Sequence, residues 1–401
     1  MAEYGVVLAV ITVGIITALG ALALAISGKL GNVKNVLSRW RGRVLSPHFR
    51  RSDDYTVVVP LYGHPRYFGN REALKHLKAN VVVAMDVGNP VMRDFALQLV
   101  AEGWRVACTA MPAPNPPLLI RFAIESGQVR TKYVVRVDAD TRPLEDIGRY
   151  IARIEEDGAD VCSAKVHVAD PNTQAQKMQA LEYRMAMLSR HFRPWLTSGA
   201  CMVARVDAMR RIFYFHSLWF PGEDIETGRV ARALGMRVRH LDMEVETDAP
   251  ESWVGLLRQR RLWWAGNFRH TIVNLDKNAL RMPIWSFYYV ALVWIGIYFK
   301  WHAIASYANA GEALKLIAGS LAICALLILV ANFQVRSWRM LIFPVYAMGQ
   351  ALLMPLVGSI YYPFLARQQQ SLGRYRFGYR KLSPEATRAY ALPCGEAPSR
   401  V

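Results

Sequence analysis

The sequence has few cysteines and lacks the glycine-rich motifs with which many nucleotide-binding folds hold phosphate. Its five cysteines form no CxxC pair. Cys108, Cys162 and Cys201 fall in the polar middle of the chain, which predicts reduced thiols in the cytosol. No GxGxxG or GxxxxGK[ST] follows the first predicted strand at 55–63. This absence argues against a dinucleotide-binding or P-loop domain.

Acidic residues are missing where basic residues gather. The chain carries 49 Lys and Arg against 31 Asp and Glu, a net charge of +18, and it is 53% hydrophobic. Residues 29–52 contain bases but no acid, and a second basic set lies in 367–381. Both sets follow apolar runs, as the cytoplasmic flanks of membrane segments do. The pattern predicts a membrane protein and argues against nucleic-acid binding.

Four uncharged runs are candidates for membrane segments. Residues 4–28 are long enough to cross a bilayer, and because no basic region precedes them we predict an anchor rather than the alternative, a signal peptide. Runs at 282–299, 316–335 and 340–366 follow the middle region. The last contains three prolines and is not expected to be one straight helix. If it re-enters, the basic tail stays inside; if all three runs span, the tail emerges outside.

The middle region alternates strand-like and helix-like patterns. This alternation predicts an α/β sandwich with a mostly parallel sheet. The predicted strands are 55–63, 80–89, 104–111, 132–140 and 160–168, and the predicted helices between them include 91–102 and 144–157.

Carboxylates stand at the ends of two of these strands. Asp86 ends the second strand, and Asp138 and Asp140 end the fourth. Residues i and i+2 of a strand point the same way, and the carboxyl edge of an open α/β sheet is where ligands bind. Such oxygen ligands suit Mg²⁺ or Mn²⁺ held against a diphosphate. The alternative is a polar turn after an edge strand.

Two later stretches add acids, tryptophans and arginines. Glu223 and Asp224 precede a helical stretch, where carboxylates serve either chemistry or the cap of the helix N-terminus. The stretch 253–270, "WVGLLRQRRLWWAGNFRH", sets paired tryptophans beside arginines. A helix lying on a membrane surface has the same composition, so that alternative stays open.

The chain contains, in order, a strand that ends in Asp, a DxD pair, GED and QxxxW, followed by membrane segments. In this order of motifs it resembles the inverting family 2 glycosyltransferases. More narrowly, it resembles the membrane-embedded hyaluronan, chitin-oligosaccharide and cellulose synthases. The resemblance covers roughly 50–385 and includes "VVVPLYG", "AMDVGN", "VDADT", "TSGACMVARVDAM", "GEDIETG" and "RQRRLWWAGNFRHT". The stretch "YYPFLARQQQSLGRYRFGYRK" is similar to the pre-gating segment and gating loop of hyaluronan synthases, which stay cytosolic.

The resemblance implies an α/β GT-A (Rossmann-like) catalytic domain with transmembrane and interfacial α-helices. It implies a multi-pass protein of the cell membrane whose catalytic domain is cytoplasmic. The expected parts are an anchor (1–28), a basic linker (29–52), the GT-A domain (53–253), an interfacial Trp/Arg helix region (254–281), a membrane domain with two spans and a re-entrant segment (282–366), and a basic gating-loop-like tail (367–401).

For the donor, the resemblance implies a uracil packed against Pro60 to Tyr62 and contacted by Asp86. Asp138 would take the nucleotide side of the DxD pair and, with Asp140, hold Mg²⁺ or Mn²⁺. The metal would offset charge on the departing diphosphate.

For the acceptor, the resemblance implies that Asp224 is the general base, with Glu223 beside it in the catalytic pair. One base and in-line displacement imply inversion, from an α-linked donor to a β-linkage. Ser198 and Gly199 would line the acceptor side. Trp263 would stack on the acceptor sugar, while Gln259, Arg260 and Arg261 face the diphosphate.

Two departures from the family pattern concern phosphate handling. The QxxRW motif reads QRRLW here, so its arginine is displaced by one residue, about 100° around a helix. The family's GK before the DxD strand is absent from 115–127, which contains no lysine. Either the tail arginines within 371–381 compensate by closing over the nucleotide, or the activity is weak.

The sequence therefore predicts an inverting enzyme that uses a UDP-sugar, with UDP-GlcNAc or UDP-glucose as first candidates. The leading hypothesis is a processive polysaccharide synthase coupled to membrane translocation. One alternative is a non-processive enzyme that glycosylates a lipid, as ceramide glucosyltransferases do. Another is a membrane scaffold without catalysis. The expected partners are the donor, a growing glycan or lipid acceptor, and the bilayer.

Overall fold

The computed structural model describes residues 51–273 except 112, 113 and 192, the segment 342–369, and a few isolated positions between 301 and 325. The predicted anchor, the linker, the apolar runs at 282–299 and 316–335, and the tail lie outside the described residues, apart from a few positions. The predictions made for those segments, including the cytosolic gating role of the tail, stay predictions.

The described core is built on one mixed sheet of eight strands in the order β3-β2-β1-β4-β7-β6-β8-β5. Neighbours from β3 to β4 are parallel, and β7 runs antiparallel between β4 and β6. All five strands predicted from the sequence are present, although the sheet is more mixed than expected. The bounds are β1 Tyr55–Leu61, β2 Val81–Asp86, β3 Arg105–Thr109, β4 Tyr133–Val137, β5 Thr141–Pro143, β6 Val161–Val168, β7 Cys201–Arg205 and β8 Val238–Thr247.

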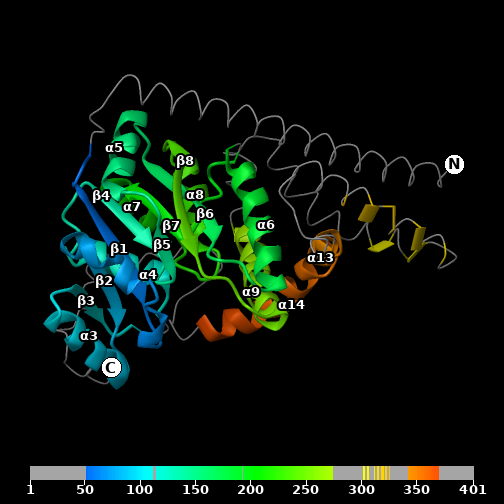
Figure 1. Ribbon diagram of the computed structural model, residues 1–401, viewed down its shortest axis with the longest axis horizontal. Helices are drawn as coiled ribbons and strands as arrows, with labels where there is room; N and C mark the ends of the chain where they lie inside the picture. Colours follow the sequence, from blue (N-terminus) through cyan, green and yellow to red (C-terminus); the bar gives the residue numbers. More distant parts are fainter. Residues whose placement is uncertain are drawn as a thin grey trace.

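Helices cover both faces of this sheet (Figure 1). Two of them begin with the same device: Asn89 and Asn115 each accept a hydrogen bond from a backbone N–H in the first turn, and a proline follows directly. The bounds are α3 Pro90–Ala101, α4 Pro116–Glu125, α5 Ile147–Asp157, α6 Gln174–Arg190, α7 Val206–Phe215, α8 Glu223–Ala233 and α9 Trp253–Val273, with shorter η1 Pro65–Tyr67, α2 Arg71–Leu74 and η2 Lys75–Asn80 after β1.

The hydrophobic core lies in two layers, one on each face of the sheet. Val57 and Val59 of β1 point into the layer shared with α3 and α5, whereas Val58 points into the layer shared with α4 and α7. This alternation follows from the period of two in a strand. The result is the predicted α/β sandwich. Of the thiols, Cys162 and Cys201 are free as expected, but Cys108 is disulfide-bonded, with its partner outside the described residues.

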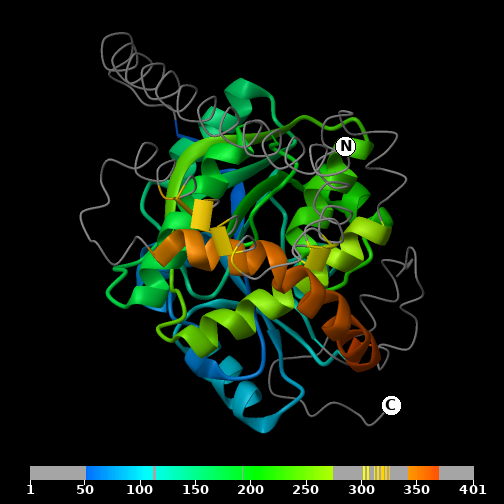
Figure 2. The same ribbon diagram turned by 90° about the vertical axis from the view of Figure 1, so that its right-hand side faces the viewer.

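Two helices from the proline-bearing run pack against α9. They are α13 Phe343–Leu352 and α14 Met354–Gln369, and α14 runs alongside α9 (Figure 2). A bend of 46° separates the two, which confirms that the run is not one straight helix. In the part of the chain that the structure describes, no single helix is long and apolar enough to cross a bilayer. Taken together, α13 and α14 have the length and the apolar composition of a membrane-crossing segment. Re-entry stays a prediction.

The close approach of α14 to α9 depends on Gly358. A Cβ at Gly358 would lie 2.6 Å from the backbone carbon of Trp264, whereas a Cβ at Gly349 in α13 would meet nothing within 4 Å. We therefore expect Gly358→Ala to destabilise the protein by about 1–3 kcal/mol through overpacking. Gly349→Ala is the matched control, and it should be neutral or slightly stabilising. Thermal unfolding of the purified variants measures both, and equal effects would contradict the packing argument.

Candidate active site

The site forms at the carboxyl edge of the sheet, where β4 ends and α8 begins. Arg136 lies on β4 with its guanidinium buried, and its Nη2 is 3.0 Å from Asp138 Oδ1 and 2.6 Å from Glu223 Oε1. Its Nε donates a second hydrogen bond to Asp138, at 3.1 Å. One buried cation thus joins the first acid of the DxD pair to the first acid of α8. The structure therefore brings together two stretches that the sequence analysis could only place separately.

Asp224 is held in place by backbone amides. Its Oδ2 accepts a hydrogen bond from the Gly199 N–H at 2.8 Å, and its Oδ1 accepts one from the Ile225 N–H at 2.8 Å. A Cβ at Gly199 would lie 2.9 Å from Arg136 Nη2 and 3.5 Å from Asp138 Oδ2, so a side chain here would push on the Arg136 guanidinium. Ser198, the other predicted residue of this turn, is buried beside it. The turn before β7 thus fixes the orientation of Asp224.

Burial changes the protonation of these acids. It raises the pKa of Asp138 to about 6, and Arg136 opposes that rise. Burial also raises the pKa of Glu223 well above its usual range, again against the pull of Arg136. A cation beside a carboxylate favours its charged form, so Arg136 lowers the pKa of both Asp138 and Glu223 relative to burial alone. Arg136 therefore keeps negative charge available at the edge of the sheet.

Asp140 differs from Asp138 in being exposed. The Thr141 hydroxyl lies 3.3 Å from its Oδ1. Among the described residues, no group of three His, Cys, Asp or Glu side chains is arranged to hold a metal ion. Mg²⁺ is commonly held by one or two carboxylates together with substrate phosphates and water. Asp140 and the second oxygen of Asp138, which forms neither of the two hydrogen bonds to Arg136, are oxygen donors of the kind that hold a divalent ion together with phosphate.

The predicted nucleotide residues lie along the same edge. Pro60 is buried within β1, opposite Ala84 of β2, and Tyr62 follows the strand. Burial raises the pKa of Tyr62, and the charges of Glu223 and Asp138 add to the rise. Asp86 ends β2 and is 8% exposed, and its Oδ1 has no hydrogen-bond partner within the described protein. An unpaired buried acceptor suits a ligand that donates an N–H.

The residues predicted on α9 lie at a different junction. Arg260 is buried and its Nη2 is 2.5 Å from Glu182 Oε2 of α6, while its Nε donates to the Tyr346 hydroxyl of α13 at 3.2 Å and its Nη1 to Gln259 Oε1 at 2.7 Å. The displaced arginine thus joins α9 to α6 and α13. Within the described part of the chain, no hydrogen bond or ion pair joins Gln259 or Arg260 to the carboxylates at the edge of the sheet. Their assignment to the diphosphate stays a prediction.

The two other α9 residues contact aromatic rings. Arg261 lies over the Tyr361 ring of α14, 4.0 Å from its centroid. Trp263 is stacked on Tyr183 of α6, with centroids 6.2 Å apart and planes at 9°, and Arg260 lies over the Trp263 ring at 4.2 Å. Because Trp263 remains 38% exposed, a sugar can still reach it. Its role as acceptor platform stays a prediction.

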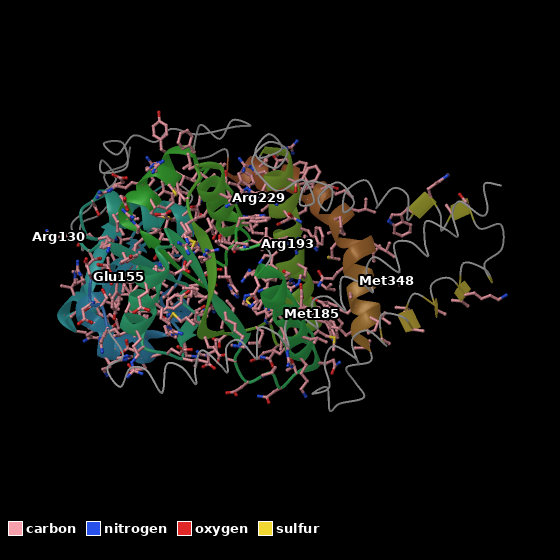
Figure 3. All side chains as sticks on the ribbon, turned by 90° about the horizontal axis from the view of Figure 1, so that it is seen from above. Arg130, Glu155, Met185, Arg193, Arg229 and Met348 are labelled. Atoms are coloured by element: carbon pink, nitrogen blue, oxygen red, sulfur yellow. The ribbon has the colours of Figure 1, made fainter. Side chains whose placement is uncertain are left out.

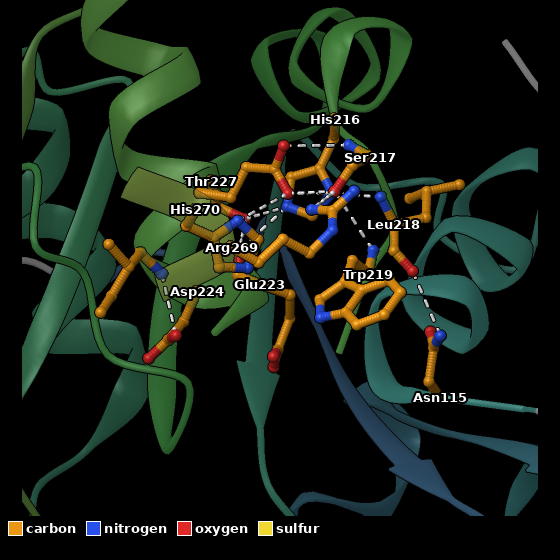
Figure 4. A network of polar contacts seen from close by, with 12 residues as sticks. Asn115, His216, Ser217, Leu218, Trp219, Glu223, Asp224, Thr227, Arg269 and His270 are labelled. Atoms are coloured by element: carbon orange, nitrogen blue, oxygen red, sulfur yellow. Dashed lines mark hydrogen bonds and ion pairs between the residues drawn. The ribbon is translucent and has the colours of Figure 1, made fainter. Parts of the chain in front are cut away.

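Sequence reasoning missed a buried polar network behind α8 (Figure 4). Glu226 is 0% exposed and accepts hydrogen bonds from the Ser217 N–H, at 3.2 Å, and from the Ser217 hydroxyl. Burial would raise the pKa of Glu226, but His216, His270 and Arg269 outweigh it and lower the pKa to about 2. The anchored carboxylate ties the first turn of α8 to the loop before it and to the end of α9.

The network continues to the proline-bearing segment. Arg269 Nη1 donates to the Ser217 hydroxyl at 3.1 Å, and its guanidinium lies 4.5 Å from the centre of the Trp219 ring. Trp219 in turn meets Tyr362 of α14, with ring centroids 5.9 Å apart. Packing thus connects α14 to the helix that carries Glu223 and Asp224. The stretch "GEDIETG" indicated that this helix carries a further acid, because Glu226 follows Asp224 by two residues.

Comparison with known proteins identifies a family. The sequence profile described as "Glycosyl transferase family group 2" matches residues 133–354, more than half of the chain. A search of curated proteins gives no match.

The fold is similar to that of a solved structure. A mannosyltransferase from Pyrobaculum calidifontis in complex with GDP-Man and Mn²⁺ has a TM-score of 0.53 at 12% identity, covering 85% of this chain and 98% of that one. This likeness supports the predicted GT-A (Rossmann-like) domain. S. aureus TarS in complex with UDP-GlcNAc has a TM-score of 0.39 at 15% identity, covering 77% of this chain and 91% of that one. Glucosyl-3-phosphoglycerate synthase from Mycobacterium tuberculosis has a TM-score of 0.35 at 12% identity, covering 57% of this chain and 80% of that one.

The environment of Asp86 predicts a pH-dependent stability difference. Burial raises the pKa of Asp86 to about 6, above its usual value of 3.8, so the charged form destabilises the fold. That penalty is complete above about pH 6 and absent below about pH 4. Asp86→Asn should therefore raise the free energy of unfolding by about 1–3 kcal/mol at pH 8, and by much less at pH 4.

Unfolding experiments at pH 4, 5, 6 and 8 measure this difference. Asp94→Asn, at an exposed position of α3, is the control and should show no such trend. An Asp86→Asn effect of equal size at pH 4 and pH 8 would refute the role given to burial.

Proposed function

The chain belongs to glycosyl transferase family group 2 and is a glycosyltransferase, and from this premise we propose an inverting enzyme that transfers a sugar from a UDP-sugar to an acceptor hydroxyl. The proposed product is a β-linked polysaccharide, made processively and passed through the protein's own membrane segments. The single observation that carries the proposal is the buried Arg136. Through it the strand-end acids and the acids of α8 form one site.

Asp224 is the proposed base. Backbone amides orient both of its oxygens, so the carboxylate has a fixed direction before substrate arrives. From there it takes the proton of the acceptor hydroxyl as that oxygen attacks the anomeric carbon. Attack opposite the leaving diphosphate inverts the anomeric centre, so an α-linked donor gives a β-linkage. A positioned base of this kind contributes about 10²–10⁴-fold in rate.

The donor is proposed to bind across the ends of β1, β2 and β4. Asp86, with its unpaired Oδ1, accepts the N–H of the base, and Tyr62 packs beside it. Asp138, held by Arg136, faces the nucleotide, and Asp140 with Asp138 would hold Mg²⁺ or Mn²⁺. The metal, when bound, stabilises charge on the departing diphosphate. Because the similar mannosyltransferase is complexed with GDP-Man, a guanine donor is the alternative to UDP-GlcNAc or UDP-glucose.

The membrane location is part of the proposal. Basic residues at 29–52 and 367–381 support a cytoplasmic catalytic domain in a multi-pass protein of the cell membrane. The exposed apolar side chains of α13 and α14, among them Val345, Ile360 and Phe364, support contact with lipid. A non-processive enzyme that glycosylates a lipid acceptor is the second candidate. It is favoured by the same exposed helices, which would bring the acceptor to the site.

The first test is turnover by the purified full chain. Labelled UDP-GlcNAc, UDP-glucose and GDP-mannose are supplied in turn with Mn²⁺, and the products are sized and their anomeric configuration is determined. A polydisperse β-linked polymer is expected.

Asp224→Asn should retain UDP binding but lose transfer by at least about 10²-fold. Asp94→Asn is the control. A single discrete glycolipid would establish the second candidate, and near-normal turnover by Asp224→Asn would remove the assigned base.

The second test concerns the metal. Asp140→Ala should abolish the metal-dependent part of UDP binding, because the exposed carboxylate supplies the ion with a hard oxygen ligand. Titration with UDP, with and without Mn²⁺, measures this by calorimetry, and Asp94→Ala should bind as the unmodified chain does. Full transfer activity in excess EDTA would exclude the metal.

A further inference from the structure

Asn70 stands at the start of α2, yet its side chain does not cap that helix. An asparagine at a helix start commonly accepts a hydrogen bond from a backbone N–H of the first turn. The Asn70 side chain makes no such bond, although its backbone carbonyl accepts the Leu74 N–H at 3.0 Å. Side chains fill the interior around the sheet (Figure 3), and Asn70 is 0% exposed within it.

The buried amide is directed instead at the turn that carries the DxD pair. Its Nδ2 donates to the backbone carbonyl oxygens of Asp138, at 2.9 Å, and of Thr141, at 2.6 Å. The backbone N–H of Asn70 donates to the Ala139 carbonyl at 3.0 Å. One residue from the loop after β1 thus holds three carbonyl groups of the turn 138–141. The catalytic assignments above do not use it.

These bonds restrict the backbone on both sides of Asp140. The peptide unit before Asp140 carries the Ala139 oxygen, which Asn70 holds. The peptide unit after it carries the Thr141 N–H, which donates to the Asp138 oxygen at 2.9 Å. The Asn70 side chain holds that same oxygen. Because a peptide unit is planar, fixing the two units fixes the direction in which the side chain between them leaves the backbone.

The chemistry of the partners determines which end of the amide faces the turn. Both partners of Nδ2 are carbonyl oxygens, so the opposite orientation would place Oδ1 against two acceptors. Oδ1 itself has no hydrogen-bond partner among the residues that the structure describes. Asn70→Leu is therefore a sharp change, because it keeps the branched shape, adds no charge and removes both side-chain hydrogen bonds.

We propose that Asn70 is a positioning residue for the metal: it holds the turn 138–141 so that Asp138 and Asp140 bind one divalent ion together. This inference rests on the proposed function, which supplies the ion and its two carboxylates, and it adds the residue that sets their geometry. Residues that orient metal ligands commonly change metal affinity by about 10–100-fold when they are substituted. The alternative is that Asn70 serves folding alone.

The test is Mn²⁺ binding by the purified full chain. Each chain is titrated with Mn²⁺ in the presence of UDP and, separately, of GDP, and electron paramagnetic resonance measures the free ion. Asn70→Leu should weaken Mn²⁺ binding by about 10–100-fold. Asn70→Ser, which can still donate one hydrogen bond, should lose less. UDP affinity in EDTA should change far less than Mn²⁺ affinity, because Asp86 and Tyr62 stand at the ends of other strands.

Asn115→Leu is the matched control. Asn115 is also buried, and its Nδ2 also donates to a backbone carbonyl, that of Leu218 at 3.1 Å. Thermal unfolding in EDTA measures the stability of every chain, and both leucine variants should unfold at a lower temperature than the unmodified chain. The Mn²⁺ affinity of Asn115→Leu should nevertheless stay unchanged when binding is measured below its unfolding transition.

The outcomes separate this inference from the proposed function. An unchanged Mn²⁺ affinity in Asn70→Leu overturns the inference, as does an equal loss in Asn115→Leu, which would trace the effect to stability. Should Asn70→Leu not fold, Asn70→Ser decides by the same criterion. If the unmodified chain binds no Mn²⁺ with either nucleotide, both this inference and the proposed metal are refuted. If it makes no β-linked polymer but binds Mn²⁺ in a way that depends on Asn70, the proposed product is wrong and this inference stands.

Discussion

The ion pairs of Arg136 are the interaction on which the rest of the site depends. A guanidinium on a buried strand holds Asp138 at one side and Glu223 at the other, although these acids come from opposite halves of the chain. Breaking a buried pair by removing one partner leaves an uncompensated charge, which costs about 3–5 kcal/mol. The same cation sets the space into which Gly199 must fit, and through Gly199 it sets the direction of Asp224. Asp138, Glu223 and Asp224 are therefore one electrostatic unit around Arg136.

A second unit lies on the far side of α8. Glu226 accepts a hydrogen bond from Ser217 and lies beside His270. Trp219, in the loop before α8, contacts Tyr362 of α14. Because α14 also packs on α9 through Gly358, the position of the proline-bearing segment and that of Asp224 are not independent. The proline-bearing segment is thus connected through packed side chains to the helix that carries Glu223 and Asp224.

Local pattern was sufficient where backbone periodicity decides the outcome. Runs of β-branched residues predicted β1 to β4 and β6, and helical spacing predicted α3 and α5. The strands β5, β7 and β8 were not predicted. "CMVAR" was read only as part of a motif, and β8 alternates polar and apolar residues because it is half-buried, which is a weaker signal than a fully apolar run. The displaced arginine was flagged from the sequence, but its ion pair with Glu182 was not.

The sequence by itself determined which acids share a strand end, since Asp138 and Asp140 are two residues apart and a strand repeats every two residues. It also determined that Asp224 stands at the start of a helix. Only the tertiary structure decided that Arg136 pairs with Glu223, 87 residues away, and that Arg260 pairs with Glu182, 78 residues away. The reason is physical: the direction of a Cβ is set by local backbone geometry, whereas the partner of a long charged side chain is set by how distant helices pack on the sheet.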